Sequence, residues 1–315
     1  MSQNIIAVVG ATGAQGGGLV RAILADKAGG FTARALTRNP DSAKARELAR
    51  LGAEVVAADT DDPESLRRAF AGASGAFCVT NFWEHHSAEK EMAQARALAQ
   101  AARDAGVKHA IWSTLEDTRR WVPLEDPRMP TLQGKYKVPH QDGKGESNRF
   151  FTELGVPTTF LLTCFYWDNL GTIMGLRRGT DGKLALVLPM ADKKLPGIAA
   201  EDIGRSAYGI FKRGAELIGK MVGIAGEHLT GQQMAAALSQ TLGQEVVYSY
   251  VPPEAYRAFG FPGADDLGNM FQFKRDFEQA FCGSRDLGFS RTLNPELQTF
   301  AQWLAQNEAR IRIDG

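Results

Sequence analysis

The feature that most constrains this chain is a glycine-rich turn close to its start. Gly10, Gly13 and Gly16 follow the apolar run 5–9 and precede a stretch, 19–24, whose apolar residues share one helical face. Strand, glycine turn and helix in this order are typical of the opening unit of a dinucleotide-binding sheet. Glycine suits the turn because a Cβ would strain the backbone or keep it away from a pyrophosphate, and the following helix N-terminus attracts anions. We predict that the whole turn contacts the coenzyme: Gly10, Ala11, Thr12, Gly13, Ala14, Gln15 and Gly16.

Apolar segments with strand character alternate with helical segments through the first half of the chain. Asp62 and Pro63 are typical of a helix start, and Gly52 and Gly106 of helix ends. The connections are short enough for right-handed parallel crossovers. This pattern predicts an α/β protein with a doubly wound parallel sheet of the Rossmann type. We expect strands over 5–9, 32–37, 54–58, 77–80, 109–113 and 158–167, and a loop over 118–138.

The end of the second expected strand indicates which coenzyme the site prefers. NAD sites carry an Asp or Glu near this point to accept a hydrogen bond from the ribose 2′-hydroxyl, whereas an arginine accommodates the 2′-phosphate of NADP. This sequence has Arg38 there and no carboxylate. We therefore expect NADP(H), with Arg38 on the extra phosphate. Asp59, which follows the third strand, is expected near the adenine.

The second half of the chain follows a less regular pattern. Its 315 residues suggest about two domains. We predict that residues 1–169 form the NADP(H)-binding domain, with later segments completing its sheet. Residues 170–315 are expected to form a smaller mixed α/β lobe that shapes the substrate cavity. A capping box at Thr230 predicts a helix, and Asn294 is the expected start of the last one. The apolar stretch 259–273 is either a lid or a homodimer surface.

Composition and charge exclude several other classes of function. Lys plus Arg and Asp plus Glu both number 36, so no global field attracts nucleic acid or an anionic membrane. No signal peptide is expected, and no apolar run approaches the ~20 residues of a membrane span. Three cysteines without CxxC spacing favour a reducing compartment, and we expect a cytoplasmic protein. His85 and His86 lack further ligands at suitable spacing, so no metal site is expected.

Several blocks of the sequence resemble the NmrA-like family, whose members are atypical short-chain dehydrogenases/reductases. The blocks are 10–16, 37–40, 80–84, 140–146, 261–271 and 293–295, so the resemblance covers nearly the whole chain. It implies an NADP(H)-binding Rossmann fold. It further implies that NADP(H) is held by the glycine turn together with Arg38, Thr80, Asn81, Phe82, Lys144, Cys164, Phe165 and Tyr166.

The segment that matches the catalytic pattern of the superfamily lacks its tyrosine. Reductases of the superfamily carry Tyr-x-x-x-Lys, in which the lysine lowers the pKa of the tyrosine so that it donates a proton as hydride arrives. Here the segment has His140 and Lys144, which share one helical face at this spacing. Lys144 keeps the ability to bind the nicotinamide ribose. His140 is either the proton donor or a histidine that bonds a loop or the ribose.

Two functions are therefore expected from the sequence. The first is an NADP(H)-binding redox sensor or regulator, whose surface toward a protein partner changes with the coenzyme; the absent tyrosine favours it. The alternative is a reductase that transfers hydride from NADPH to a quinone or another small carbonyl compound. Its substrate cleft is expected to be lined by Trp83, Tyr166 and the segment around Phe271.

Overall fold

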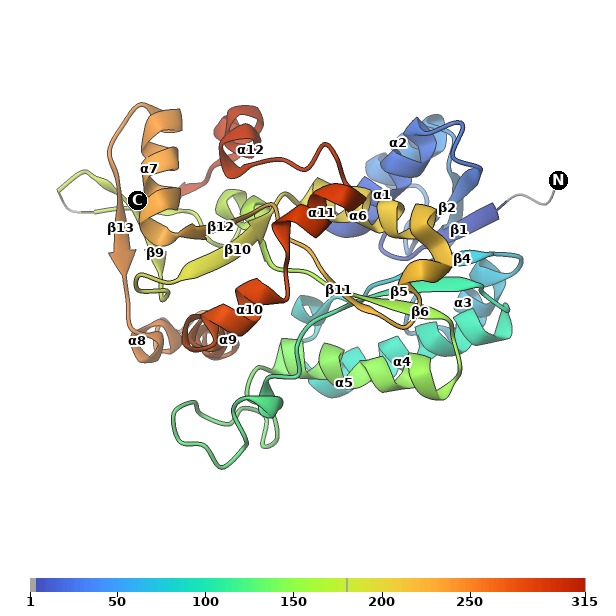
Figure 1. Cartoon of the computed structure of the whole chain (residues 1–315), viewed down its shortest axis with the longest axis horizontal. Coiled ribbons are helices and arrows are strands. Elements are labelled where there is room, and N and C mark those ends of the chain that lie inside the picture. Colours follow the sequence, from blue (N-terminus) through green and yellow to red (C-terminus); the bar gives the residue numbers. More distant parts are fainter. Residues whose placement is uncertain (1–3, 180, 315) are drawn as a thin grey trace.

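The computed structural model describes residues 4–179 and 181–314. Seven parallel strands form the main sheet in the order β11-β6-β5-β4-β1-β2-β3 (Figure 1). The predicted doubly wound parallel sheet is confirmed. The order reverses between β1 and β4, and open α/β sheets bind ligands outside the carboxyl ends of strands at such a point. The strands are β1 (Asn4–Val8), β2 (Phe31–Thr37), β3 (Glu54–Ala57), β4 (Gly75–Cys78), β5 (His109–Thr114), β6 (Thr158–Leu162) and β11 (Met221–Gly223).

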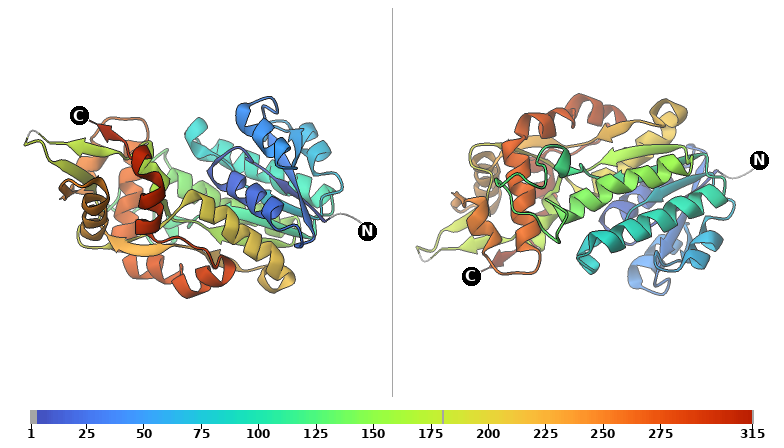
Figure 2. Two further views of the ribbon diagram at one scale, coloured as in Figure 1. Left: turned by 90° about the horizontal axis from the view of Figure 1, so that it is seen from above. Right: turned by 90° about the horizontal axis from the view of Figure 1, so that it is seen from below.

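Helices cover both faces of this sheet (Figure 2). Side chains alternate between the faces of a strand, so Ile6 and Val8 of β1 pack with α1, α2 and α6, while Ala7 packs with α3, α4 and α5. All three side chains are fully buried, which is why β1 reads as a continuous apolar run. The helices are α1 (Ala14–Ala25), α2 (Ala43–Arg50), α3 (Pro63–Phe70), α4 (Ala88–Asp104), α5 (Pro139–Glu153) and α6 (Ala200–Arg213).

A second, smaller part of the molecule surrounds its own core. It contains a three-stranded sheet, β12-β10-β7, and a four-stranded sheet, β13-β9-β8-β14. β11 and α6 come from the same half of the chain but join the main sheet and one of its helix layers. The further strands are β7 (Phe165–Tyr166), β8 (Leu176–Arg178), β9 (Leu184–Leu188), β10 (Lys194–Ile198), β12 (Glu227–Thr230), β13 (Val246–Tyr250) and β14 (Ile313–Asp314). The further helices are α7 (Gly231–Leu242), α8 (Pro253–Arg257), α9 (Ala264–Asp276), α10 (Glu278–Gly283), α11 (Leu287–Leu293) and α12 (Phe300–Asn307).

The strand expected over 158–167 is two strands that belong to different sheets. β6 ends at Leu162, and β7 pairs with β10 in the three-stranded sheet. Between them, the fully buried Arg285 donates from Nε and Nη2 to the carbonyl of Thr163, at 3.0 and 2.6 Å. Because the apolar run is continuous, no local pattern indicates that a distant guanidinium binds a carbonyl at this point.

The last helix begins later than expected. The sequence predicts its start at Asn294, but α12 begins at Phe300, where Thr299 and Gln302 form a reciprocal capping box. The buried carboxylate of Asp202 holds the chain before it in an irregular path, accepting from the Asn294 amide at 3.1 Å and the Gln298 backbone N–H at 2.9 Å. The capping box predicted at Thr230 is confirmed, and it begins α7.

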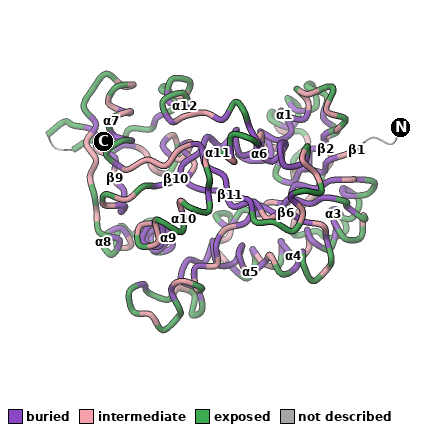
Figure 3. Tube along the Cα trace, in the orientation of Figure 1, coloured by how far each residue is buried: buried purple, intermediate pink, exposed green. Residues whose placement is uncertain are grey.

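The apolar stretch 259–273 is mostly an internal helix. Phe271 and Phe273 of α9 are buried in the second core, whereas Phe259 and Phe261 before it are exposed. Figure 3 shows the central strands of the main sheet as buried, whereas the edge strand β3 is intermediate to exposed and the loop between β5 and α5 is exposed mainly over 123–135. None of the helices within residues 4–179 and 181–314 is both long and apolar enough to cross a bilayer.

Candidate functional site

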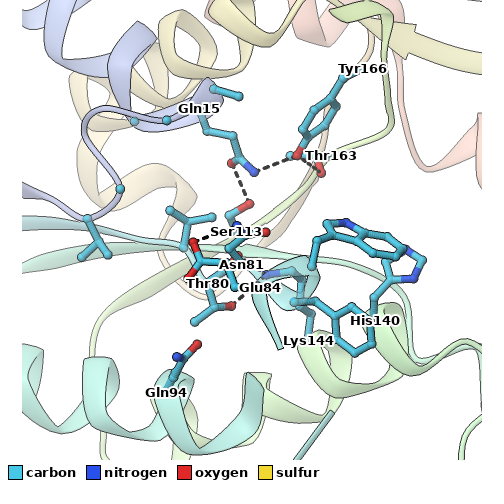
Figure 4. Close-up of a pocket in the computed structure, with 18 of the residues that line it drawn as sticks. Gln15, Thr80, Asn81, Glu84, Gln94, Ser113, His140, Lys144, Thr163 and Tyr166 are labelled. Carbon is cyan, nitrogen blue, oxygen red and sulfur yellow. Dashed lines mark hydrogen bonds between the residues drawn. The ribbon is translucent and has the colours of Figure 1, made fainter. Parts of the chain in front are cut away.

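A cavity of about 630 Å³ lies at the carboxyl ends of β1, β2, β4, β5 and β6 (Figure 4). It begins at the glycine turn and reaches α9 of the smaller part. The structure brings most of the predicted site residues together on its wall. Those that line it are Gly10, Thr12, Gly13, Ala14, Gln15, Gly16, Arg38, Thr80, Asn81, Phe82, His140, Lys144, Cys164, Phe165 and Tyr166.

Two predicted residues do not line the cavity. Ala11 is fully buried in the core beside β1. The carboxylate of Asp59 accepts a hydrogen bond from the backbone N–H of Asp61 at 2.9 Å, which closes a turn within its own loop. Its chain neighbours Ala58 and Thr60 line the cavity in its place.

The glycine turn leaves its backbone open toward the cavity. Gly10 has a φ of +63°, which disfavours other residues, and a Cβ on Gly16 would lie only 2.5 Å from the Gly10 carbonyl oxygen. α1 begins within this turn, at Ala14, with no side-chain cap at Gly13 and no acidic residue in its first turn. The unpaired N–H groups of a helix N-terminus bind anions, so the turn fits the diphosphate of a dinucleotide.

Gln15 connects the turn to the ends of two other strands. Its amide donates to the Tyr166 hydroxyl at 2.7 Å and accepts from the Ser113 hydroxyl at 2.8 Å. Tyr166 in turn lies 3.3 Å from the hydroxyl of Thr163 (Figure 4). This chain of hydrogen bonds connects the start of α1 to β5 and β7 on the cavity wall. The sequence analysis selected Gln15 and Tyr166 but had no local signal for their pairing.

Arg38 lies at the rim of the cavity and is already paired. Its Nη1 and Nη2 contact the two carboxylate oxygens of Glu84 at 2.8 and 2.9 Å, and the Asn81 amide donates to the same carboxylate at 3.1 Å. Partial burial opposes ionisation of Glu84, but the hydrogen bonds from Asn81 and Arg38 lower its pKa below the usual value. An incoming phosphate would therefore have to replace this carboxylate on the guanidinium.

Lys144 belongs to a buried polar network. Its Nζ lies 2.6 Å from the carboxylate of Glu91 and donates to the Thr80 carbonyl at 3.0 Å and hydroxyl at 2.8 Å. Glu91 is fully buried on α4, between the buried Ala88 and Ala95. The sequence analysis missed this carboxylate, although an acidic residue on the apolar face of a helix is a usable signal.

His140 is held by a residue from the far end of the sequence. Asp266 on α9 accepts the His140 backbone N–H at 3.0 Å, and its second oxygen contacts Nδ1 of the same residue. The ring lies between Phe82 and Trp83, with centroid distances of 5.9 and 5.1 Å. Within residues 4–179 and 181–314, Nε2 of His140 has no hydrogen-bond partner. Because the aspartate occupies Nδ1 and His140 lines the cavity, Nε2 is the nitrogen available to a ligand.

Buried groups near β7 stay protonated. Burial raises the pKa of the Cys164 thiol to about 12 and that of the Tyr166 hydroxyl to about 12. A thiol becomes nucleophilic only as thiolate, so Cys164 is a packing residue at neutral pH.

Beyond Cys164 and Tyr166, toward α9, the cavity wall is mostly apolar. Trp83 and Tyr166 line it as expected, but Phe271 does not; its neighbours on α9 do. The other wall residues of this end are Asn169, Ile173, Met174, Leu267, Met270 and Lys274.

Comparison with known proteins finds a matching family, related sequences and related structures for nearly the whole chain. The NmrA-like family matches residues 2–304. The NmrA-like family domain-containing oxidoreductase FrzB of Cladobotryum sp is 31% identical over 288 residues, which cover 85% of this chain and 83% of that protein. The negative transcriptional regulator NmrA in complex with NADP is 24% identical, with a TM-score of 0.79 over 97% of this chain and 95% of that one.

The Citrobacter sp. triphenylmethane reductase complexed with NADP(H) is also 24% identical, with a TM-score of 0.75 over 96% of this chain and 99% of that one. Identities at this level establish the shared fold and not a shared activity. The family match, in contrast, extends over nearly the whole sequence and includes the glycine turn, His140, Lys144 and α9. This chain belongs to the NmrA-like family.

Proposed function

We propose that this protein binds NADP(H) and uses it to reduce a small, largely apolar carbonyl compound such as a quinone. The observation that carries the proposal is the continuity of the cavity. It runs from the glycine turn, past His140 and Lys144, to the apolar wall of α9, and so offers room for a coenzyme and a second molecule. Relatives named as oxidoreductases and solved structures with NADP or NADP(H) support the same reading.

The residues present fit such a coenzyme. The turn from Gly10 to Gly16 would hold the diphosphate on its free N–H groups, and Arg38 would hold the 2′-phosphate after leaving Glu84. Lys144 would reach the nicotinamide ribose by exchanging one of its two contacts with Thr80 for a ribose hydroxyl, and would keep its contact with Glu91, because all three donors of its ammonium are engaged in the free protein. NADPH, when bound, supplies a hydride.

His140 is the best candidate for the proton that accompanies the hydride. Asp266 orients its ring and stabilises the imidazolium, as a carboxylate does for histidines in other acid–base sites. Nε2 of His140 then donates a proton into the cavity and regains one from water. Trp83 and Phe82 pack on the ring and limit the access of water. The histidine therefore takes the place of the tyrosine that the wider superfamily uses.

The test is oxidation of NADPH with a panel of quinones and small aldehydes and ketones. Asp266→Asn keeps the shape of the side chain but removes the charge that supports the imidazolium. We expect kcat to fall about 100-fold, within the range of general acid catalysis, with the Kd for NADPH unchanged. Asp265, the preceding residue, is exposed, so Asp265→Asn is the matched control and should leave kcat unchanged. An unchanged kcat in Asp266→Asn, or no turnover with any acceptor, would refute the proposal.

The pairing of Arg38 favours a second candidate function, a sensor of coenzyme occupancy. Binding of the 2′-phosphate would release Glu84 and so alter the short 3₁₀ helix Phe82–Glu84, which carries the partly exposed Trp83. NADPH and NADP⁺ carry the same phosphate, so this response would report occupancy and not redox state. The fluorescence of Trp83 is the difference between the emission of the wild type and that of Trp83→Phe. We expect this difference to change equally when NADPH or NADP⁺ is added, and not to change with NADH. A response to NADPH alone would instead support redox sensing.

A further inference from the structure

Lys274 lies on a part of the cavity wall that is otherwise apolar. It shares one face of α9 with Leu267 and Met270, at helical spacings of seven and four residues, and all three line the cavity. The side chain is buried, with 4% of the residue exposed. None of the roles assigned above to the coenzyme-binding residues or to His140 uses this lysine.

The ammonium group of Lys274 has no hydrogen bond or ion pair within the described residues, 4–179 and 181–314. Its neighbours are aromatic: Nζ lies 5.9 Å from the ring centroid of Phe271 and 5.2 Å from that of Phe281. The carboxylate in this region, Glu116, is already engaged by both Nη atoms of Arg285 at 2.6 and 3.1 Å. The local charges are therefore two cations and one anion.

This arrangement is unfavourable unless a ligand completes it. Burial, together with a smaller effect of the nearby Arg285, lowers the pKa of Lys274 to about 8. A buried ion without a partner carries a desolvation penalty that contact with aromatic rings offsets only in part. The group is still mostly protonated at neutral pH, so it offers hydrogen-bond donors to the cavity. Unpaired buried charges of this kind are concentrated at functional sites.

We propose that Lys274 binds the substrate, donating a hydrogen bond to a carbonyl oxygen of a quinone-like molecule that packs on Leu267 and Met270. This inference rests on the proposed reductase function and names its substrate-binding cation. Cys164, in the segment between β6 and β7, lines the same cavity as Lys274. The family resemblance implies that this segment contacts the coenzyme. A cation there also stabilises the negative charge that develops on an oxygen as hydride arrives.

The test measures binding without turnover. The protein is saturated with NADP⁺, which cannot reduce a quinone, and titrated with menadione while the quenching of tryptophan fluorescence is recorded. We expect Lys274→Met to weaken menadione binding at least tenfold and to leave the Kd for NADP⁺ unchanged. Lys193→Met, which removes an exposed lysine outside the cavity, is the matched control and should behave as the wild type. Equal affinity of the wild type and Lys274→Met, or no binding to the wild type, would overturn the inference.

Thermal unfolding without ligands separates a binding role from a structural one. Methionine fills nearly the same space as lysine but carries no charge, so removal of an uncompensated ion should raise the Tm of Lys274→Met by ~2 °C or more. A lower Tm would assign the lysine a structural role. Failure of the wild type to bind NADP⁺ would refute the proposed function alone. In that case, menadione titration of the wild type and of Lys274→Met, both without coenzyme, would still show whether Lys274 binds the quinone.

Discussion

Removing Glu84 should tighten the binding of NADPH, although Glu84 lines the coenzyme cavity. In the free protein its carboxylate occupies both Nη atoms of Arg38, the group expected to bind the 2′-phosphate. Glu84→Gln keeps the size of the side chain and weakens this competition. It also removes a negative charge from the neighbourhood of an incoming dianion. Both effects act on the phosphorylated coenzyme and neither acts on NADH.

The magnitude follows from exposure and charge. The side chains of Arg38 and Glu84 are 62% and 43% exposed, and an exposed ion pair contributes ~0–1 kcal/mol. A carboxylate at ~6 Å repels each unit of phosphate charge by ~0.7 kcal/mol in water, before screening by salt. The sum is about 1–2 kcal/mol, which corresponds to ~5–30-fold tighter binding of NADPH.

The assay is a fluorescence titration of wild type and Glu84→Gln with NADPH and NADH at low and high salt. The gain for NADPH should shrink as salt rises, because the charges are exposed. Glu64→Gln is the matched control, since it breaks an equally exposed pair with Arg67 on α3. An unchanged Kd for NADPH, or an equal gain for NADH, would show that Glu84 does not compete for Arg38.

Three further predictions concern the turn, the buried network and pH. Gly16→Ala places a Cβ 2.5 Å from the Gly10 carbonyl oxygen, so the turn must shift. We expect a loss of ~1–3 kcal/mol in the binding free energy of NADPH, measured by titration, and an unaltered Kd would contradict this role of the turn. Lys144→Met removes the ammonium from the buried Glu91, whose carboxylate then keeps only the Thr80 hydroxyl at 2.6 Å and the nearby His85. We expect a cost of ~3–5 kcal/mol of unfolding free energy in urea, most of which Glu91→Gln should restore in the double variant. Burial lowers the pKa of His109 in the folded protein to about 4, whereas in the unfolded chain it is ~6.5. Protons therefore bind the unfolded chain preferentially, and the free energy of unfolding in urea should fall by ~2 kcal/mol between pH 7 and pH 5 because of this residue. His109→Gln should lack this part of the pH dependence.

Short-range patterns predicted the parts of the fold that short-range physics determines. Asp62 caps α3 as expected, its carboxylate accepting from the backbone N–H groups of Glu64 and Ser65. Gly52 and Gly106, the expected helix ends, follow α2 and α4 and have positive φ values of +108° and +64°. The glycine turn and the first five expected strands lie where the apolar runs place them, apart from small shifts at their ends, whereas the sixth expected strand is divided between two sheets.

Contacts between distant residues could not be predicted in the same way. Asp266 orients His140 across 126 positions of sequence, and no local spacing points to that pair. Arg285 ends β6 by binding the Thr163 carbonyl, although the apolar run continues. Glu91 is different, since its place on the apolar face of α4 was readable from the sequence.

The central claim is that the glycine turn and Arg38 together bind a dinucleotide with an extra phosphate. The most direct test is the ratio of the Kd for NADH to that for NADPH in the wild type and in Arg38→Ala. A charge-assisted hydrogen bond contributes ~1.5–3 kcal/mol, so we expect a wild-type preference for NADPH of at least ~10-fold that Arg38→Ala abolishes, with NADH binding unchanged. Equal binding of the two coenzymes by the wild type, or a preference that survives in Arg38→Ala, would contradict the account.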